Sequence, residues 1–150
     1  MTNTEWMRAA LDEAQLAIAH DDVPVGAVVV RVSTGEIVAR AHNARERDCD
    51  PTAHAEILAL RDAARAAGTW RLDDHALVVT LEPCPMCAGA AWAARISQIV
   101  FGAADPKAGA AGTLYNFAAD PRLNHEIQVV PGVLDDECGA LLSAFFASRR

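Results

Sequence analysis

The sequence predicts an α/β fold in which helices cover a central sheet. Segments with apolar residues at helical spacing alternate along the chain with short runs rich in β-branched residues, and this alternation is typical of that fold class. With 150 residues and a hydrophobic content of 52%, the chain is long enough to bury a core without disulfide bonds. We therefore expect a single domain over residues 1–150.

The N-terminal segments predict a helix followed by a β-hairpin. Apolar residues recur at helical spacing from about Glu5 to Ala19, which predicts an amphipathic helix. The β-branched run from Val25 to Val32 is followed by turn residues and then by an apolar stretch from Ile37 to Ala41. Two such runs around a short turn predict a hairpin.

A charged loop and a second helix are expected next. The loop runs from Asn43 to Asp50. Asp50 and Pro51 resemble an N-cap followed by proline at the first helical position, so we expect a helix from there to about Ala67, with Gly68 as its end. This assignment places His54 in the first turn of the helix.

The C-terminal half predicts three further strands and two helices. Pro85 has no backbone N–H and can begin a helix without losing a hydrogen bond. Glycine and alanine are abundant between Gly102 and Gly112, which favours a loop. The remaining elements are expected in the order strand, helix, strand, strand and helix, at Ala76–Leu81, Met86–Ala94, Ile96–Phe101, Ile127–Val130 and Asp135–Ser148.

Two short motifs predict a catalytic zinc site. His54-Ala55-Glu56 is followed by Pro83-Cys84-Pro85-Met86-Cys87, and together these segments supply three good zinc ligands in His54, Cys84 and Cys87. A structural zinc site has four protein ligands, whereas a catalytic site keeps one position for a water molecule whose pKa falls to roughly 7. The pattern therefore indicates an open metal position beside a carboxylate.

The expected position of these motifs on helices explains how they can share one ion. A helix N-terminus has a partial positive charge that favours a thiolate. Residues two apart point to nearly opposite sides of a regular helix, so His54 and Glu56 can share a site only if zinc lies near the mouth of the helix. We expect His54 at the very start of its helix and Glu56 reaching over the metal-bound water as the proton carrier.

Other interpretations of the cysteines are weaker. A Cys-x-x-Cys pair alone is often a redox pair or half of a structural zinc knuckle. A redox pair does not require the upstream histidine and glutamate, and Cys49 and Cys138 lack the spacing of a second ligand pair. A non-enzymatic zinc module, in which Glu56 only caps or pairs, remains an alternative. We assign none of the remaining histidines to zinc: His20, His42, His75 and His125.

Composition limits the partners of the chain. The net charge of −7 argues against indiscriminate binding of nucleic acid, which depends on many phosphate contacts by Lys and Arg. The sequence contains neither an apolar run long enough for a membrane span nor a secretory signal pattern at its N-terminus. We expect a cytoplasmic protein with reduced cysteines, no membrane partner, and a local patch for any RNA partner.

Several blocks beyond the zinc motifs resemble one family. The chain resembles the bacterial tRNA adenosine deaminases of the cytidine deaminase superfamily. The zinc motifs indicate the superfamily, and the other blocks indicate the tRNA enzymes. These blocks are Val23-Pro24-Val25-Gly26-Ala27-Val28, Asp50-Pro51-Thr52-Ala53, Leu81-Glu82, Phe101-Gly102-Ala103, Asp105 to Gly112, Asn124-His125 and Glu137 to Phe146.

The resemblance implies a fold, an activity and partners. It implies a three-layer α/β/α cytidine-deaminase-like fold with a mixed sheet of about five strands and one Zn²⁺ per subunit. The implied activity is conversion of adenosine to inosine at the wobble position of a tRNA anticodon, in an arginine tRNA, by a homodimer that binds the anticodon stem-loop. The alternative within the superfamily is a deaminase of a free base, guanine or cytosine.

The resemblance also implies substrate-binding residues. Asn43 would contact the flipped base, and Asp105 would lie beside the sugar of a neighbouring nucleotide. Backbone groups around Ala55 and Pro83 would bind the base and the attacking water, and Lys107 would contact a phosphate. Because the net charge is −7, we expect RNA binding to be salt-sensitive or concentrated on a few basic residues, namely Arg45, Arg47, Lys107, Arg149 and Arg150.

Overall fold

The computed structural model describes residues 1–149, so Arg150, one of the expected RNA contacts, lies outside the described residues. Within this range the chain forms a five-stranded sheet and four helices, and none of these helices has the length and apolar character of a membrane span. The elements are α1 (Asn3–Ile18), β1 (Gly26–Arg31), β2 (Ile37–His42), α2 (Ala55–Ala67), β3 (His75–Leu81), α3 (Pro85–Ala93), β4 (Gln98–Ala103), β5 (Gln128–Val130) and α4 (Asp135–Ala147).

The sheet is mixed, as predicted. Its strand order is β2-β1-β3-β4-β5, and β1 runs antiparallel to both β2 and β3, whereas β3, β4 and β5 are parallel. Leu81 at the end of β3 pairs with Ala103 at the end of β4. The loops that follow these two strands therefore leave the sheet at the same edge.

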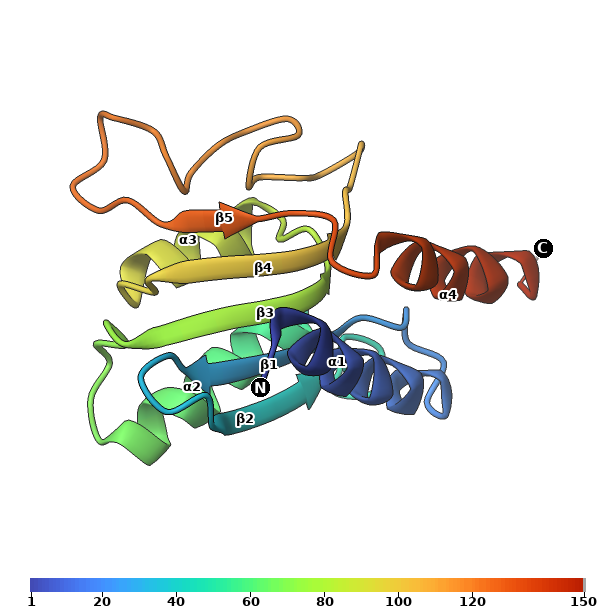
Figure 1. The fold of residues 1–150 in the computed structure, drawn as a ribbon. Coiled ribbons are helices and arrows are strands. Elements are labelled where there is room, and N and C mark those ends of the chain that lie inside the picture. The colour runs from blue at the N-terminus through green and yellow to red at the C-terminus, as the bar shows by residue number, and fades with distance from the viewer. Residues whose placement is uncertain (150) are drawn as a thin grey trace.

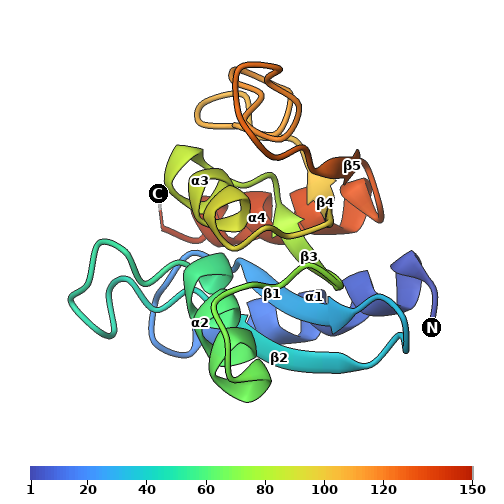
Figure 2. The same cartoon turned by 90° about the vertical axis from the view of Figure 1, so that its left-hand side faces the viewer.

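Helices cover both faces of the sheet, which confirms the predicted three-layer architecture. Helices α1 and α4 lie on one face and α2 and α3 on the other (Figures 1 and 2). The sheet separates two apolar cores, and alternate residues of β1 belong to one or the other. Ala27 and Val29 pack towards α2 and α3, and Val28 and Val30 pack towards α1. Strand β3 is buried on both faces over most of its length, so it forms the centre of the molecule.

Helix α2 begins later than the sequence predicted. Asp50 and Pro51 do not open it, because the Asp50 side chain accepts hydrogen bonds from the backbone N–H and the hydroxyl of Thr52, both at 2.8 Å, and forms a local turn instead. The N-cap is His54. The predicted end is correct, because Gly68 terminates the helix in the left-handed conformation with φ of 71°.

Strand β4 also begins later than predicted. Residues from Ile96 onward were expected in the strand, but the N–H of Ile96 bonds to the carbonyl oxygen of Ala91 at 3.1 Å and closes the end of α3. Arg95 has a φ of 62° in this turn. The strand can therefore start only at Gln98, once the backbone has left the turn.

Gly26 allows α1 to pack directly on β1, and its replacement should be costly. A Cβ atom added at Gly26 would lie 2.0 Å from the carbonyl oxygen of Ala10 and 2.5 Å from the nitrogen of Ala14. We expect Gly26→Ala to lower the free energy of unfolding by about 3 kcal/mol, at the upper end of overpacking costs. Urea denaturation followed by circular dichroism measures the change.

Gly139 provides a control, because its replacement by alanine should stabilise the protein. It lies inside α4, and an added Cβ would meet no atom within 4 Å among the described residues. Gly139→Ala should therefore raise the free energy of unfolding by about 0.5–1 kcal/mol, because alanine loses less backbone entropy in a helix. Equal losses in both variants would contradict close packing at Gly26 as the cause.

Candidate active site

The three predicted zinc ligands lie at the starts of two helices. His54 is the N-cap of α2 and Cys84 is the N-cap of α3, both with extended backbone conformations. Pro85 occupies the first turn of α3, and Cys87 follows within the same turn. Within residues 1–149, neither N-cap side chain makes a capping hydrogen bond to its own helix, so neither is used to cap the helix that it precedes.

The distances between the ligand atoms fit a zinc ion. The Nδ1 atom of His54 lies 3.6 Å from Sγ of Cys84 and 3.4 Å from Sγ of Cys87, and all three ligand atoms lie within 4.8 Å of one another. Tetrahedral zinc with Zn–S bonds of about 2.3 Å and Zn–N bonds of about 2.0 Å places sulfur and nitrogen about 3.6 Å apart. His54, Cys84 and Cys87 therefore form a zinc-binding triad.

Among the described residues, the other histidines and cysteines do not belong to a metal-binding group. Cys138 is buried against Gly102, as expected for a packing residue, and Cys49 is an exposed thiol in the loop before α2. The described part of the chain thus offers no cysteine pair to complete a structural zinc knuckle. The triad has the open composition expected of a catalytic site.

The site favours a thiolate at Cys84. A hydrogen bond with the Cys87 thiol and, after it, one with His54 lower the pKa of the Cys84 thiol to about 4, although burial opposes the change. The same hydrogen bond and burial raise the pKa of Cys87 above its usual range. Cys84 is therefore ionised at neutral pH, whereas Cys87 must release its proton when a metal binds.

Glu56 is a buried carboxylate next to the triad. It lies in the first turn of α2, is 4% exposed, and lines the same cavity as His54 and Cys84. Burial raises its pKa to about 7, and the negative charge of Cys84 adds to the rise. A carboxyl group with such a pKa can both accept and donate a proton near neutral pH.

The cavity beside the triad has a volume of about 200 Å³. Of the predicted substrate-binding residues, Asn43, Ala55 and Asp105 line it. Pro83 and Lys107 are not among its lining residues. Pro83 is buried and its carbonyl oxygen accepts a hydrogen bond from the N–H of Ala110, whereas Lys107 is exposed on the turn after Asp105.

Asn43 has a fixed orientation in the cavity wall. Its Nδ2 atom donates to the carbonyl oxygen of Val23 at 3.2 Å, and its Oδ1 atom accepts from the N–H of Arg45 at 3.2 Å. An amide side chain has two donor hydrogens and two acceptor lone pairs. One donor and one acceptor position therefore remain for a ligand.

Glu82 is a site residue to which the sequence alone assigned no role. It is 1% exposed, and its carboxylate accepts hydrogen bonds from the N–H groups of Asp105, Ala111 and Thr113, each at 3.1 Å, and from the Thr113 hydroxyl. Burial raises the pKa of Glu82, but the hydrogen bonds together hold it below the usual range. Glu82 thus organises the loop that carries Asp105 to the cavity.

Removing the Glu82 carboxylate should destabilise the protein. Glu82→Ala leaves several loop N–H groups without an acceptor, so we expect the free energy of unfolding to fall by about 2 kcal/mol or more. A lowered folded pKa means that this contribution is present above the unfolded pKa of about 4.3 and is lost as the pH falls through the folded pKa. Denaturation at several pH values should therefore show the gap from wild type narrowing in acid.

The exposed Glu36 provides the control for this prediction. Glu36→Ala removes the same group from a surface turn and should leave stability unchanged at every pH. A gap between wild type and Glu82→Ala that stayed constant down to pH 2 would contradict an ionised Glu82 as the organising group.

Comparisons with known proteins agree with this site. Residues 1–103 match the cytidine and deoxycytidylate deaminase zinc-binding region. The tRNA-specific adenosine deaminase of Bacillus subtilis is 52% identical over 151 residues, covering 100% of this chain and 92% of that protein. A solved structure from a study of A-to-I editing by tRNA:A34 deaminases at the wobble position has a TM-score of 0.87 and 42% identity, covering 93% of this chain and 99% of that one.

A related enzyme with a different substrate is less similar. The structure of a guanine deaminase from Nitrosomonas europaea has a TM-score of 0.80 and 29% identity, covering 96% of this chain and 84% of that one. The fold and the zinc triad are thus those of the zinc-dependent deaminases of the cytidine and deoxycytidylate deaminase family. Within that family, the chain belongs to the tRNA-specific adenosine deaminases.

Proposed function

We propose that this protein deaminates adenosine to inosine at the wobble position of a tRNA anticodon. The observation that carries the proposal is the 42% identity and TM-score of 0.87 to a structure studied for this editing reaction, in a chain whose His54, Cys84 and Cys87 can hold zinc. An arginine tRNA is the proposed substrate, and a homodimer is the proposed assembly. A tRNA substrate would place the activity in the cytoplasm.

The proposed chemistry is hydrolysis of the bond between C6 of adenine and its amino group. When bound by the triad, zinc would supply a Lewis acid that lowers the pKa of a water molecule to roughly 7. Glu56 would accept a proton from the attacking water and deliver it to ring nitrogen N1. It would then accept the second proton from the hydroxyl now bonded to C6 and deliver it to the amino group, so that the C6–N bond breaks, the C6 carbonyl forms and ammonia leaves. Burial of Glu56 beside the triad supports this role, because it raises the pKa of Glu56 to a value that suits proton transfer in both directions.

Other residues would bind the flipped nucleotide and its neighbours. Asn43 has a free donor and a free acceptor position for the base, and Asp105 lies at the rim of the same cavity, where it would contact a sugar. Backbone groups at Ala55 and Pro83 would bind the base and the water. Lys107, which is exposed beyond the cavity, would contact a phosphate.

The direct test is deamination of a synthetic RNA. The zinc-loaded protein should convert the wobble adenosine of an arginine tRNA anticodon stem-loop to inosine, measured by digestion to nucleosides and chromatography. The same stem-loop with guanosine at that position is the matched control and should stay unchanged.

Free bases distinguish the alternative activity. Guanine and cytosine should be left intact, with no ammonia released under the same conditions. Turnover of guanine without turnover of the stem-loop would replace the proposal with the activity of the Nitrosomonas europaea relative.

A further inference from the structure

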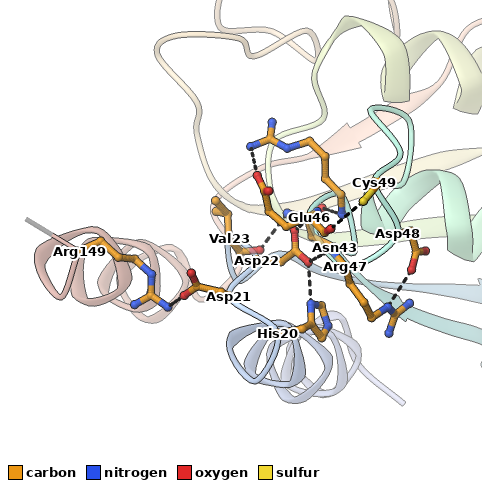
Figure 3. Close-up of polar contacts among 11 residues, drawn as sticks. His20, Asp21, Asp22, Val23, Asn43, Glu46, Arg47, Asp48, Cys49 and Arg149 are labelled. Atoms are coloured by element: carbon orange, nitrogen blue, oxygen red, sulfur yellow. Dashed lines mark hydrogen bonds and ion pairs between the residues drawn. The ribbon is translucent and has the colours of Figure 1, made fainter.

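Asp22 is a buried carboxylate outside the zinc triad. It is 0% exposed and lies between α1 and β1, one residue before the cavity-lining Val23. Its Oδ1 atom accepts a hydrogen bond from the N–H of Glu46 at 2.6 Å, and its Oδ2 atom accepts one from the N–H of Arg47 at 3.1 Å. Oδ2 also lies 2.6 Å from Nδ1 of His20 (Figure 3).

These contacts keep Asp22 ionised. Burial raises the pKa of Asp22, but the hydrogen bonds from Glu46, Arg47 and His20 outweigh it and hold the pKa below the usual range. Hydrogen bonds to an ionised acceptor are about twice as strong as those between neutral groups. Asp22 is therefore a strong attachment point for the two backbone N–H groups.

The attached segment forms part of the cavity wall. We call residues 43–50 the 43–50 loop; it includes Asn43 and Arg45, which line the cavity. Residues 45–49 are all exposed, so apolar burial contributes little to holding this part of the loop. Hydrogen bonds must therefore fix the conformation of this part of the loop. The hydrogen bonds to Asp22 connect it to the segment that carries Val23.

A second contact connects the residue before Asn43 to α1. His42, which directly precedes Asn43, has its Nδ1 atom 2.9 Å from Oε2 of Glu13 on α1. The ring of His42 lies 5.3 Å from the ring of His20, the partner of Asp22. The end of β2 is thus connected to α1, and the 43–50 loop is connected to the residues that follow α1.

We propose that Asp22 is a positioning residue whose carboxylate fixes the 43–50 loop and so holds Asn43 and Arg45 ready to bind the substrate. The inference rests on the proposed function, because the inference treats Asn43 and Arg45 as residues that bind RNA. A loop that is ordered before binding avoids the loss of affinity that occurs when only a fraction of the molecules can bind. Asp22 would therefore act on KM, without contacting the substrate.

Asp22→Asn is the variant that tests this role. It keeps the size of the side chain but replaces one acceptor oxygen with an amino group, which cannot accept a hydrogen bond from a backbone N–H. We expect KM for the stem-loop to rise about tenfold, as it would if the competent loop fell to a tenth of the population. We expect kcat per bound zinc to change less than about threefold, because the triad and Glu56 are untouched.

Limited digestion with trypsin tests the same role without using activity. Arg45 and Arg47 are exposed trypsin sites within the 43–50 loop. Cleavage after these residues, followed by mass spectrometry of the fragments, should be about ten times faster in Asp22→Asn than in wild type, since proteolysis follows the population of the open segment. Cleavage at sites outside the loop should not accelerate.

Asp74→Asn is a matched control. Asp74 also accepts hydrogen bonds from a turn, through the N–H and hydroxyl of Ser33, but it lies just before β3, at the other end of this strand from the cavity. The Asp74→Asn substitution should leave both KM and cleavage in the 43–50 loop unchanged. A purely structural role for Asp22 predicts instead that Asp22→Asn lowers Tm and leaves KM unchanged.

A second variant keeps the test decisive if Asp22→Asn does not fold. His20→Gln leaves the carboxylate in place but alters its partner, so KM should rise by about threefold, as it would if a third of the molecules kept an ordered loop, and cleavage in the loop should accelerate with it. Wild-type values of both in a folded Asp22→Asn protein, or in His20→Gln if only that variant folds, would overturn the inference. If wild-type protein made no inosine, the proposed function would fail, while trypsin would still decide whether Asp22 holds the loop.

Discussion

Replacing Glu56 with alanine should lower the rate of inosine formation by about 10²- to 10⁴-fold, the usual contribution of a positioned general acid and base. Glu56 is 4% exposed and lines the cavity beside His54 and Cys84, but it is not a member of the metal-binding group. The variant should therefore keep its zinc and its fold. Single-turnover assays on the stem-loop measure the rate, and mass spectrometry of the metal measures zinc per chain.

Two comparisons make this prediction specific. Glu56→Gln keeps the shape of the side chain but cannot carry the proton, so it should be as slow as Glu56→Ala. Glu46→Gln alters an exposed glutamate of the 43–50 loop and should keep the wild-type rate. Loss of zinc from Glu56→Ala would assign the carboxylate to the metal site and favour the non-enzymatic zinc module.

Cys87→Ser should abolish activity by a different route, through loss of the metal. Cys87 is fully buried, and its Sγ lies 3.4 Å from Nδ1 of His54, so a hydroxyl in its place provides a much poorer zinc ligand. We expect less than one tenth of the wild-type zinc content and no measurable inosine. Because a ligand that binds only the folded state stabilises by about 2.7 kcal/mol at 100 times its Kd, Tm should also fall.

The effect on Tm can be separated from the effect of the substitution. Wild type treated with a chelator should melt close to Cys87→Ser, and added zinc should raise the Tm of wild type alone. Cys49→Ser changes an exposed thiol in the loop before α2 and should keep both zinc and activity. One zinc per chain in Cys87→Ser would show that Cys87 is not a required ligand.

The zinc ligands could be predicted from sequence because each motif is local. His54 and Glu56 are two residues apart, Cys84 and Cys87 are three apart, and histidine, glutamate and cysteine are chemically distinctive. The start of α2 could not be predicted, because Asp50 and Pro51 suit a helix start and a local turn equally well. The turn is seen only in the structure, where the N–H and the hydroxyl of Thr52 donate hydrogen bonds to the Asp50 side chain.

Asp22 and Glu82 could not be found in the same way. Apart from His20 and the Thr113 hydroxyl, their hydrogen-bond donors are backbone N–H groups, which every residue except proline carries, and so the sequence contains no pattern for them. The donors are also distant along the chain, 24 and 25 residues away for Asp22 and 23 to 31 for Glu82. A folded structure is needed to show that both acids hold loops of the cavity.

The central place of β3 has a consequence for the order of folding. Strands β1 and β2 are neighbours in sequence and can pair early, whereas Ala27 of β1 pairs with Val79 of β3 only after a long segment has closed. Cys84 follows β3 directly and meets His54 only when that strand is in place. We therefore expect zinc to be captured late, by a sheet that is already assembled, so that metal uptake reports completed folding and does not initiate it.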